Sequence, residues 1–354
     1  MNSASSIPWR ASLVTRFVLL WSLLLGGLVL LCGWLIWRGG RDSLILTWQD
    51  NLRHDAAAVE LKLQSTVVSV MRDAAYLAKI PILREFVRAQ GSPLQEQWRK
   101  LIEDEFHALL EGKPSYFQVR FIGLADEGRE LIRLDNNQGQ IETIPQDRMQ
   151  KKGDRDYFRE ALQVPPDTVY VSAINLNQEF GKVTEPHIPT LRAAMQVKAE
   201  SGATFGVLVI NVDVSTLLAD LANLPGNATR LMLAAPNGDF LIHPDAAHTF
   251  GSDLGQPWRY VESKQVGGGD QDLSHVAKFP LAPGVARQMT AVLTVPADEW
   301  LRLLTAARDK AAVSTGMAAL GGIVVIALLS RWLAGRLHRV TEAMAAYEAG
   351  QETA

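Results

Sequence analysis

Two long apolar segments lie near opposite ends of the chain. Residues 17–37 carry no charged side chain, and residues 311–330 consist of apolar and small side chains. Each is about 20 residues long, which is the length a helix needs to cross the hydrocarbon core of a bilayer. We therefore predict transmembrane helices at 17–37 and 311–331, with a short segment at 1–16 before the first.

A cleaved signal peptide is the alternative for the first segment, because Arg10 and Arg16 give it a basic start. However, its apolar part is too long for a signal peptide, and it ends in Trp34 and Trp37 followed by arginines, which is typical of an interfacial anchor. Two spans place both termini on one side of the membrane. Three basic residues at the end of the second span, Arg331, Arg336 and Arg339, favour a cytoplasmic position for both termini. The N-terminal segment 1–16 is then cytoplasmic as well.

The segment after the first span has the pattern of one long helix at 38–80. It contains no proline, and apolar residues recur every three or four positions: Ile45, Trp48, Leu52, Val59, Leu63, Val70 and Leu77. Such a stalk either pairs with a second copy of the chain or packs along its own domain. Our working expectation is a homodimer, which follows only from the first alternative.

The period of the apolar pattern changes in the next part of the chain. Pro81 and Pro93 begin shorter helices, and from residue 116 the apolar side chains alternate as in strands. A hairpin at 116–145, further strands up to 213 and an exit helix after them form one α+β unit. A second α+β unit is formed by a smaller hairpin, with its turn at Asn237-Gly238, and by a last strand that leads into a helix. The expected fold class is α+β with two serial units, 81–228 and 229–310.

Composition and motifs narrow the function. A formal net charge of −3 over 354 residues gives no reason to expect a nucleic-acid partner. The single cysteine, Cys32, lies in the first span, so the part between the spans has no disulfide. Motifs of hydrolases, metalloproteases, nucleotide-binding loops, kinases and cyclases are absent, so we predict neither an enzyme nor a cofactor. The phrase "HPDAAH" offers His243, Asp245 and His248 as metal ligands, but it has the pattern of a turn after a strand, and we predict no metal.

Several phrases of the chain resemble a known sensor family. They are "YFQVRFIGLADEGRELIRL", "KKGDRDYFREAL", "VYVSAINLNQEFGKV", "PHIPTLRAAMQV", "GVLVINVDVSTLL" and "NGDFLIHPDAAHTFGSDLG". With the order of the elements they are similar to double Cache (tandem PAS-like) sensor modules of bacterial histidine kinases, diguanylate cyclases and chemoreceptors, over about residues 38–330. The resemblance implies a multi-pass protein of the bacterial inner membrane with a periplasmic module, in which 81–228 is membrane-distal and 229–310 membrane-proximal.

The resemblance also implies a ligand pocket in the first unit. In such sensors an Arg-x-aromatic-aromatic motif holds the carboxylate of a small molecule, and Arg155, Tyr157 and Phe158 match it. A guanidinium can bind a carboxylate through two parallel hydrogen bonds, while rings exclude water. Asp213 falls where amino-acid-binding members keep an acid for the ammonium group of the ligand.

Two departures separate the chain from the amino-acid-binding members. Gln150 stands where those members have a tyrosine, and Ala173 stands near a later aromatic position, for which Tyr170 is a substitute. These departures speak against an amino acid itself and favour another carboxylate-bearing or amino-acid-like ligand.

Three further arginines, Arg120, Arg133 and Arg192, are candidates for the same pocket. Arg120 and Arg133 are expected on facing strands of the hairpin, where they add positive charge that favours an acidic ligand. The alternative is a network of ion pairs that ties loops to the sheet, with acidic partners among Glu130, Asp154, Asp156 and Glu179.

The segment 332–354 has a helical seam formed by Leu337, Val340, Met344 and Tyr347. It resembles the first helix of a HAMP signalling module, with Arg336 in place of the usual proline. We therefore expect either the input part of a longer receptor or a chain that signals through a cytoplasmic partner.

The expected function is that of a transmembrane receptor whose periplasmic module binds a small ligand and passes a conformational signal through the second span. Two alternatives remain open at this point. One is a structural or partner-protein-binding protein anchored in the membrane, and the other is an anchored periplasmic hydrolase.

Overall fold

The computed structural model describes residues 13–351 except 180, 227, 257 and 262–271. The chain divides into two compact units. A central unit comprises Gln49–Ala297, and a terminal unit is formed by the two chain ends, up to Trp48 and from Asp298 onward.

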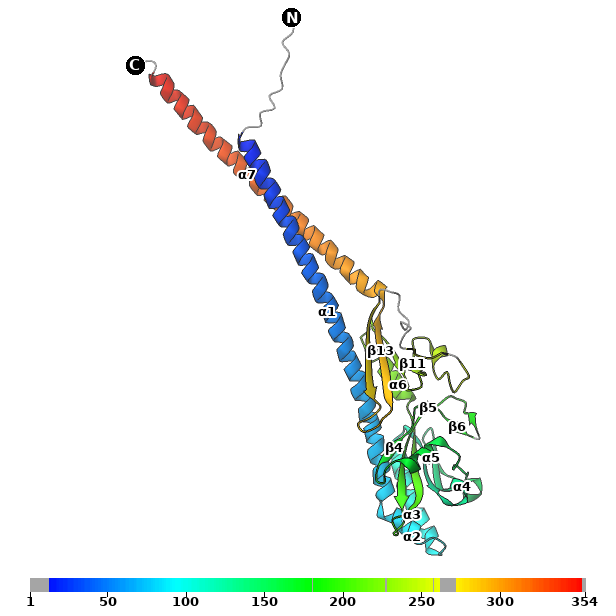
Figure 1. The fold of residues 1–354 in the computed structure, drawn as a ribbon. Coiled ribbons are helices and arrows are strands. Elements are labelled where there is room, and N and C mark those ends of the chain that lie inside the picture. Colours follow the sequence, from blue (N-terminus) through cyan, green and yellow to red (C-terminus); the bar gives the residue numbers. More distant parts are fainter. Residues whose placement is uncertain (1–12, 180, 227, 257, 262–271, 352–354) are drawn as a thin grey trace. The chain divides into compact units, whose positions relative to one another are not determined.

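The long helix α1 (Leu13–Lys79) contributes its second part to the central unit. There Gln64 Nε2 donates a hydrogen bond to Pro280 O at 2.9 Å, and Tyr116 OH donates one to Asp73 Oδ2 at 2.6 Å. The helix thus runs past both sheets of the unit (Figure 1). One face, spaced at three and four residues, is buried against them: Leu52, Ala56, Val59, Leu63, Val67, Val70, Ala74 and Leu77.

This burial decides between the two alternatives for the stalk. From Leu52 to Leu77 the apolar stripe is covered by the chain itself, so the spacing reflects packing along its own domain. The helix therefore gives no evidence of pairing, and the homodimer stays a prediction.

The larger part of the central unit, here called the first lobe, is built on a seven-stranded sheet with the order β3-β2-β1-β9-β8-β4, in which β5 also pairs with β8. Its helices α2 (Pro81–Arg88) and α3 (Leu94–Gly112) begin at or just after the two prolines, as expected. The strands are β1 (Tyr116–Gly123), β2 (Glu130–Asn137), β3 (Gln140–Thr143), β4 (Val169–Val171), β5 (Asn175–Leu176), β8 (Pro189–Lys198) and β9 (Thr204–Asp213).

The first hairpin forms as predicted, with Arg120 and Arg133 on facing strands. β1 and β2 pair antiparallel, and Arg120 lies directly opposite Arg133. The turn α4 (Ala125–Gly128) places Asp126 and Glu127 at φ of 51° and 56° in the left-handed region, which Asp adopts more readily than most residues. Two like charges opposite each other are destabilising, so the pair requires acidic neighbours.

The second lobe is a four-stranded sheet with the order β11-β10-β13-β12. Its strands are β10 (Arg230–Ala234), β11 (Phe240–Ile242), β12 (Leu273–Pro280) and β13 (Gln288–Val295). The helix α6 (Ser215–Ala222) precedes it, and Gly238, at φ +86°, makes the predicted turn between β10 and β11. Only Pro296 separates β13 from the helix α7 (Ala297–Gln351). The α+β fold with two serial lobes is confirmed. The sequence also indicates a hairpin tip at 266–272, of which 266–271 lie outside the described residues, and β12 begins directly after it.

The terminal unit consists of the first part of α1 and of α7. Both helices contain a stretch long and apolar enough to cross a membrane. These stretches lie within Leu20–Lys79, which holds residues 20–37 of the first predicted span, and within Ala297–Leu333, which holds all of the second. The helices approach closely, because a Cβ placed on Gly33 would overlap the side chain of Thr315. Small residues at such contacts are typical of packed membrane helices. Arg38 lies 5.2 Å from the ring centroid of Trp34, as expected of an interfacial anchor.

Some of the predicted segments include residues that the structure does not describe. Residues 1–12 of the predicted N-terminal segment and 352–354 at the C-terminus are outside the described residues. The HAMP-like segment is helical to Gln351 as part of α7, but the side chains of Leu337 and Tyr347 are likewise not described.

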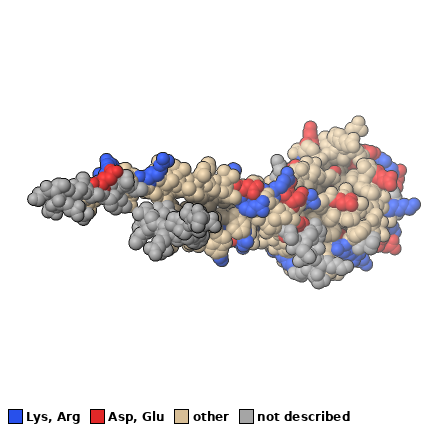
Figure 2. All heavy atoms as spheres, turned by 90° about the horizontal axis from the view of Figure 1, so that it is seen from above, with Lys and Arg blue, Asp and Glu red and all other residues tan. Residues whose placement is uncertain are grey.

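Charged side chains are spread over the central unit. On the face seen in Figure 2, Lys and Arg alternate with Asp and Glu, without a large patch of one sign. A surface of this kind attracts neither anions nor cations strongly over a distance. Any charge selectivity on this face has to arise within a local site.

Candidate ligand-binding site

The loop that leads to Arg155 is fastened to the turn between β1 and β2. Lys152 N donates to Gly128 O at 2.8 Å, and Gly153 N donates to Glu127 O at 3.0 Å. Gly128 and Gly153 meet backbone to backbone, so that a Cβ on either would overlap the other segment. The two glycines thereby set the position of the residue that follows, Arg155.

The helix α5 (Asp156–Gln163) begins immediately after Arg155, whose own backbone is extended at φ −77° and ψ 136°. Tyr157, Phe158 and Ala161 are buried in an apolar cluster on the first sheet, where their neighbours include Ile122, Tyr170 and Val209. This packing anchors α5. The guanidinium of Arg155 is therefore carried at a fixed helix start while its side chain stays half-buried.

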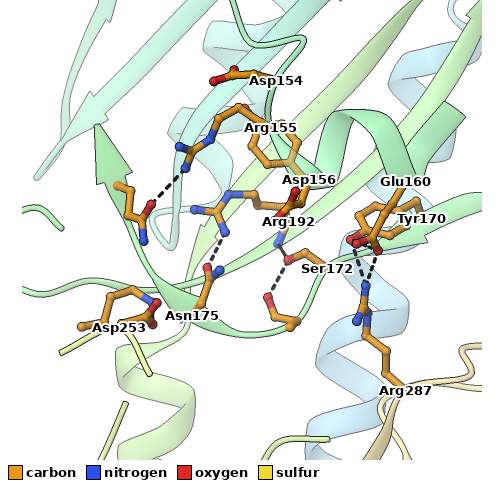
Figure 3. A pocket seen from close by; sticks show the side chains of 14 residues that line it. Asp154, Arg155, Asp156, Glu160, Tyr170, Ser172, Asn175, Arg192, Asp253 and Arg287 are labelled. Atoms are coloured by element: carbon orange, nitrogen blue, oxygen red, sulfur yellow. Dashed lines mark hydrogen bonds and ion pairs between the residues drawn. The ribbon is translucent and has the colours of Figure 1, made fainter. Parts of the chain in front are cut away.

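A cavity of about 380 Å³ lies beside α5 and is lined by both lobes (Figure 3). This volume is within the usual range for a small-molecule site. The first lobe contributes most of the wall, including Arg155, Tyr157, Tyr170, Ser172, Ala173, Asn175, Gln178 and Arg192, while Asp253 and Arg287 come from the second lobe.

Arg155 and Arg192 place two guanidinium groups at the cavity (Figure 3). Arg192 is 4 % exposed, its Nη1 donates to Asn175 Oδ1 at 2.6 Å, and its guanidinium lies 5.4 Å from the ring centroid of Tyr157. Arg155 Nη2 donates to Gln178 Oε1 at 3.4 Å. Among the described residues, neither guanidinium has a carboxylate within ion-pair distance.

The electrostatics of this pair are unfavourable without an anion. Burial lowers the pKa of Arg192 to about 10, and the positive charges of Arg120 and Arg155 act in the same direction. The group is still protonated at neutral pH, so a buried cation faces a second cation with only amides as partners. Such a charge is costly unless an anion compensates it.

A second polar cluster forms the opposite wall. Arg287 Nη2 pairs with Glu160 Oε2 at 2.6 Å and donates to Tyr170 OH at 3.0 Å, while Tyr170 OH donates to Glu160 Oε2 at 3.0 Å. Burial raises the pKa of Tyr170 to about 12, so the phenol stays neutral. Because Glu160 belongs to α5 and Arg287 to the second lobe, this ion pair joins the two lobes at the cavity.

Arg120 and Arg133 belong to an internal network instead of the cavity lining. Arg120 pairs with Glu130 Oε1 at 3.3 Å and with Glu179 Oε1 at 3.1 Å, and Arg133 pairs with Asp135 Oδ2 at 2.6 Å. For these two arginines the structure shows the ion-pair alternative. The negative charges of these acidic partners also compensate the repulsion between Arg120 and Arg133, which lie opposite each other in the hairpin.

Glu179 is the acceptor at the centre of this network, since Lys152 Nζ also lies 3.3 Å from its Oε2. Burial alone would raise the pKa of Glu179, but Arg120, Lys152 and Arg133 more than offset this and lower it to about 2. Burial, aided by Arg120, lowers the pKa of Lys152 to about 8. Glu179 follows Gln178, the partner of Arg155, so the network also holds one wall of the cavity.

The sequence-based site residues divide into two groups. Arg155, Tyr157, Tyr170 and Arg192 line the cavity. Phe158 lies in the apolar cluster, and Arg120 and Asp213 are also outside the lining. Asp213 stands at the end of β9, where its Oδ1 accepts from Ser215 N at 2.8 Å at the start of α6.

His243, Asp245 and His248, which the sequence offered as metal ligands but which we predicted to form a turn, lie in such a turn. His243 Nδ1 accepts from Asp245 N at 3.0 Å, and the rings of His243 and His248 contact each other at an angle of 53°, with centroids 4.6 Å apart. Within the described part of the chain, no group of metal-binding side chains is arranged around a common point.

Sequence reasoning missed Asn175, Gln178, Asp253 and Arg287. The first two lie in the phrase "VYVSAINLNQEFGKV", which already resembled sensor proteins, so this phrase was a usable signal. Asp253 and Arg287 lie in the second lobe, and no local sequence pattern indicates that they line a pocket of the first lobe.

The architecture itself indicates the class of protein. Two serial α+β lobes, flanked in the sequence by two candidate membrane helices and with a small cavity where the lobes meet, indicate a membrane-anchored sensor. The sequence family described as "Bacterial histidine kinase, sensor domain" matches residues 56–266. This is more than half of the chain, and the chain belongs to that family. The matched region is a sensor domain and not a catalytic one.

Solved structures show the same fold. A domain of a sensory box/GGDEF family protein from Vibrio parahaemolyticus is 17 % identical, with a TM-score of 0.56 over 71 % of this chain and 97 % of that one. The extracellular domain of the histidine kinase vpHK1S-Z8 is also 17 % identical, with a TM-score of 0.56 over 72 % of this chain and 93 % of that one.

A protein described as methyl-accepting chemotaxis protein X is 16 % identical, with a TM-score of 0.51 over 70 % of this chain and 97 % of that one. At such identities the likeness is one of fold. A search of curated proteins finds no match.

Proposed function

We propose that the chain is the input part of a bacterial receptor whose cavity binds a small carboxylate-bearing ligand. The observation that carries the proposal is the pair of guanidiniums, Arg155 and Arg192, which face the cavity without a carboxylate partner among the described residues. An anionic group between them would compensate two charges at once.

The geometry of the cavity supports a carboxylate in particular. Each guanidinium has five N–H donors in one plane, and the amides of Gln178 and Asn175 take one from each. The remaining donors suit the two oxygens of a carboxylate. Tyr157 lies against Arg192 and limits the access of water, which strengthens such an ion pair.

The route of the signal follows from chain connectivity. Arg155 stands at the start of α5, and Glu160 of the same helix pairs with Arg287, the residue directly before β13. The strand β13 leads through Pro296 into α7. In the proposed mechanism an anion at Arg155 shifts α5 and thereby moves β13 and α7. Coupling of this kind is typically about 1–3 kcal/mol.

The placement in the cell is part of the proposal. We infer that the central unit lies in the periplasm, that α1 and α7 span the inner membrane, and that α7 acts on a cytoplasmic output element or partner. A homodimer would suit this arrangement. Protease added to spheroplasts should digest the central unit and spare the termini; protection of the central unit would contradict this placement.

The test of ligand binding is the melting temperature of the full chain in lipid nanodiscs against a library of carboxylates, amino acids and amines. A ligand at 100 times its dissociation constant stabilises the folded state by about 2.7 kcal/mol. We expect a subset of carboxylates, and no simple amine, to raise the melting temperature. Arg155→Ala should abolish these shifts.

The matched control is Arg148→Ala. Arg148 is an exposed arginine that pairs with Glu142 on the surface and does not line the cavity. Its removal should leave every ligand shift intact. If Arg155→Ala also leaves the shifts intact, the binding site is elsewhere; if no small molecule stabilises the chain, the alternative of a partner-protein-binding sensor replaces the proposal.

A further inference from the structure

Glu179 brings a carboxylate of the chain itself close to the cavity. It belongs to β6 (Gln178–Glu179), which pairs with β7 (Lys182–Val183) in a separate two-stranded sheet. Successive side chains of a strand point in opposite directions. Gln178 accordingly lines the cavity and accepts a hydrogen bond from Arg155, whereas Glu179 reaches into the internal network.

The carboxylate of Glu179 is surrounded in the way that a bound anion would be. Its Oε1 accepts from Arg120 Nη2 at 3.1 Å and lies 3.8 Å from Arg133 Nη2. Its Oε2 accepts from Lys152 Nζ and from Gln150 Nε2, both at 3.3 Å. Three cations and one amide therefore hold a carboxylate that the chain supplies.

This place is connected to the cavity through one aromatic side chain. Arg120 Nη1 donates to Tyr157 OH at 3.2 Å, and Tyr157 lines the cavity and lies against Arg192. Burial lowers the pKa of Arg192, the charge of Arg120 lowers it further, and the charge of Glu179 raises it. The charges of the network therefore act on the guanidinium that we assign to the ligand.

The network has no net charge as long as Glu179 is part of it. It contains three cations and three carboxylates, namely Arg120, Arg133 and Lys152 with Glu130, Asp135 and Glu179. Without Glu179 a buried positive charge would lack compensation, and a second anionic group of a ligand would be a favourable partner for it. With Glu179 in place, such a group meets a neutral network and a nearby negative charge.

We propose that Glu179 is a specificity-determining residue, which takes the place of a second anionic group and restricts the site to ligands with one carboxylate. The inference rests on the proposed function, because the ligand carboxylate in question is the one held by Arg155 and Arg192. It adds a limit to the ligand class, since dicarboxylates of the same length are rejected. The discrimination comes from a residue outside the cavity lining.

Three variants of Glu179 separate its charge from its size. Glu179→Ala removes the carboxylate and leaves room for a second anionic group. Glu179→Gln removes the charge alone, because an amide oxygen still accepts from Arg120 and Lys152. Glu179→Asp keeps the charge on a shorter side chain. The control is Glu142→Gln, since Glu142 is an exposed carboxylate that pairs with Arg148 and does not line the cavity.

The probes are pairs of acids that differ in one terminal carboxylate: butanoate against butanedioate, pentanoate against pentanedioate, and each carboxylate that raises the melting temperature against its analogue with one carboxylate more. The full chain in nanodiscs is titrated with each by calorimetry at about pH 7, where these acids are ionised. We expect the wild type to bind the monocarboxylate of a pair at least about tenfold more tightly, which is the cost of one poorly compensated charge.

In Glu179→Ala and Glu179→Gln this preference should shrink by about tenfold or more, or reverse. Glu179→Asp and Glu142→Gln should keep it. A general loosening of the site would lower both affinities of a pair and leave their ratio unchanged, so the ratio distinguishes specificity from lost stability.

Two results would overturn the role of Glu179 while the carboxylate site stands. One is a wild type that binds the dicarboxylate of a pair as tightly as the monocarboxylate. The other is an unchanged ratio in both Glu179→Ala and Glu179→Gln. If no carboxylate of either kind binds to the wild type, the proposed function fails and this inference fails with it.

Discussion

Glu160 and Arg287 form a 2.6 Å ion pair that links α5 of the first lobe to the residue before β13 of the second. The pair lies in the wall of the cavity, and Tyr170 bonds to both partners. The pair therefore connects α5 to the start of β13, the strand whose other end leads into α7.

Removing this link should separate binding from transmission. In Arg287→Ala we expect ligand to protect the amides of α5 from hydrogen exchange as in the wild type, but to lose its protection of β13. The side chains are partly exposed, so the pair itself stabilises the fold by no more than about 1 kcal/mol. Hydrogen exchange of the full chain with and without a bound carboxylate measures both effects. Equal protection of β13 in variant and wild type would show that the signal takes another route.

Arginine geometry at position 192 should matter beyond its charge. Arg192→Lys keeps a cation but loses the planar donor set that holds Asn175 and stacks on Tyr157. We expect carboxylate affinity to fall by about tenfold or more, measured by calorimetry. The surface replacement Arg148→Lys should have no effect. Unchanged affinity in Arg192→Lys would mean that the carboxylate does not contact this side chain.

The acid stability of the protein should depend on Glu179. Its pKa is about 2 in the folded chain against an ordinary value of 4.5. Between these values the unfolded chain takes up a proton that the folded chain does not, so stability is present above pH 4.5 and is lost as the pH falls towards 2. Glu179→Gln should destabilise the protein at neutral pH by about 3 kcal/mol. In this variant the melting temperature should also depend less on pH between pH 4.5 and 2 than it does in the wild type.

The control for this titration is Glu142→Gln, an exposed carboxylate that pairs with Arg148. It should leave the acid slope of the wild type unchanged. An acid slope that persists in Glu179→Gln would place the responsible carboxylate elsewhere.

The stalk region of α1 offers a test of its packing. Leu63 is fully buried against the chain's own lobes, whereas Leu61, two residues earlier, is 70 % exposed. Leu63→Ala should lower the free energy of unfolding by about 2–5 kcal/mol, and Leu61→Ala by less than about 0.5 kcal/mol. Both can be measured by urea denaturation in nanodiscs. A larger effect at Leu61 would indicate that the exposed face is the one that packs, as in a paired stalk.

Much of the fold followed from the sequence because its signals are local. The alternation around Phe121 and the polar turn predicted a hairpin with Arg120 and Arg133 on facing strands, and the structure adds that these two residues lie directly opposite each other. The apolar stripe of the stalk was visible too, but its partner was not, since a helix buried by sheets and a helix buried by its copy show the same spacing.

The site was predictable only in part. Arg155 and Tyr157 are two positions apart in the chain and lie at the cavity as expected. Arg120 was a sound candidate by charge, but in the folded chain it forms ion pairs with Glu130 and Glu179. Asp253 enters through a contact between lobes, and such contacts between distant segments leave no local pattern.

The most direct test of the carboxylate site is a distance from the ligand to the arginines. A ligand labelled with ¹³C at its carboxylate, bound to the full chain with ¹⁵N-labelled arginine in lipid, can be examined by solid-state NMR dipolar recoupling. We predict close contacts, at roughly 4 Å, to the guanidinium nitrogens of two arginines, one lost in Arg155→Lys and the other in Arg192→Lys. Contacts that survive both replacements, or a bound carboxylate without any arginine nearby, would contradict the proposed site.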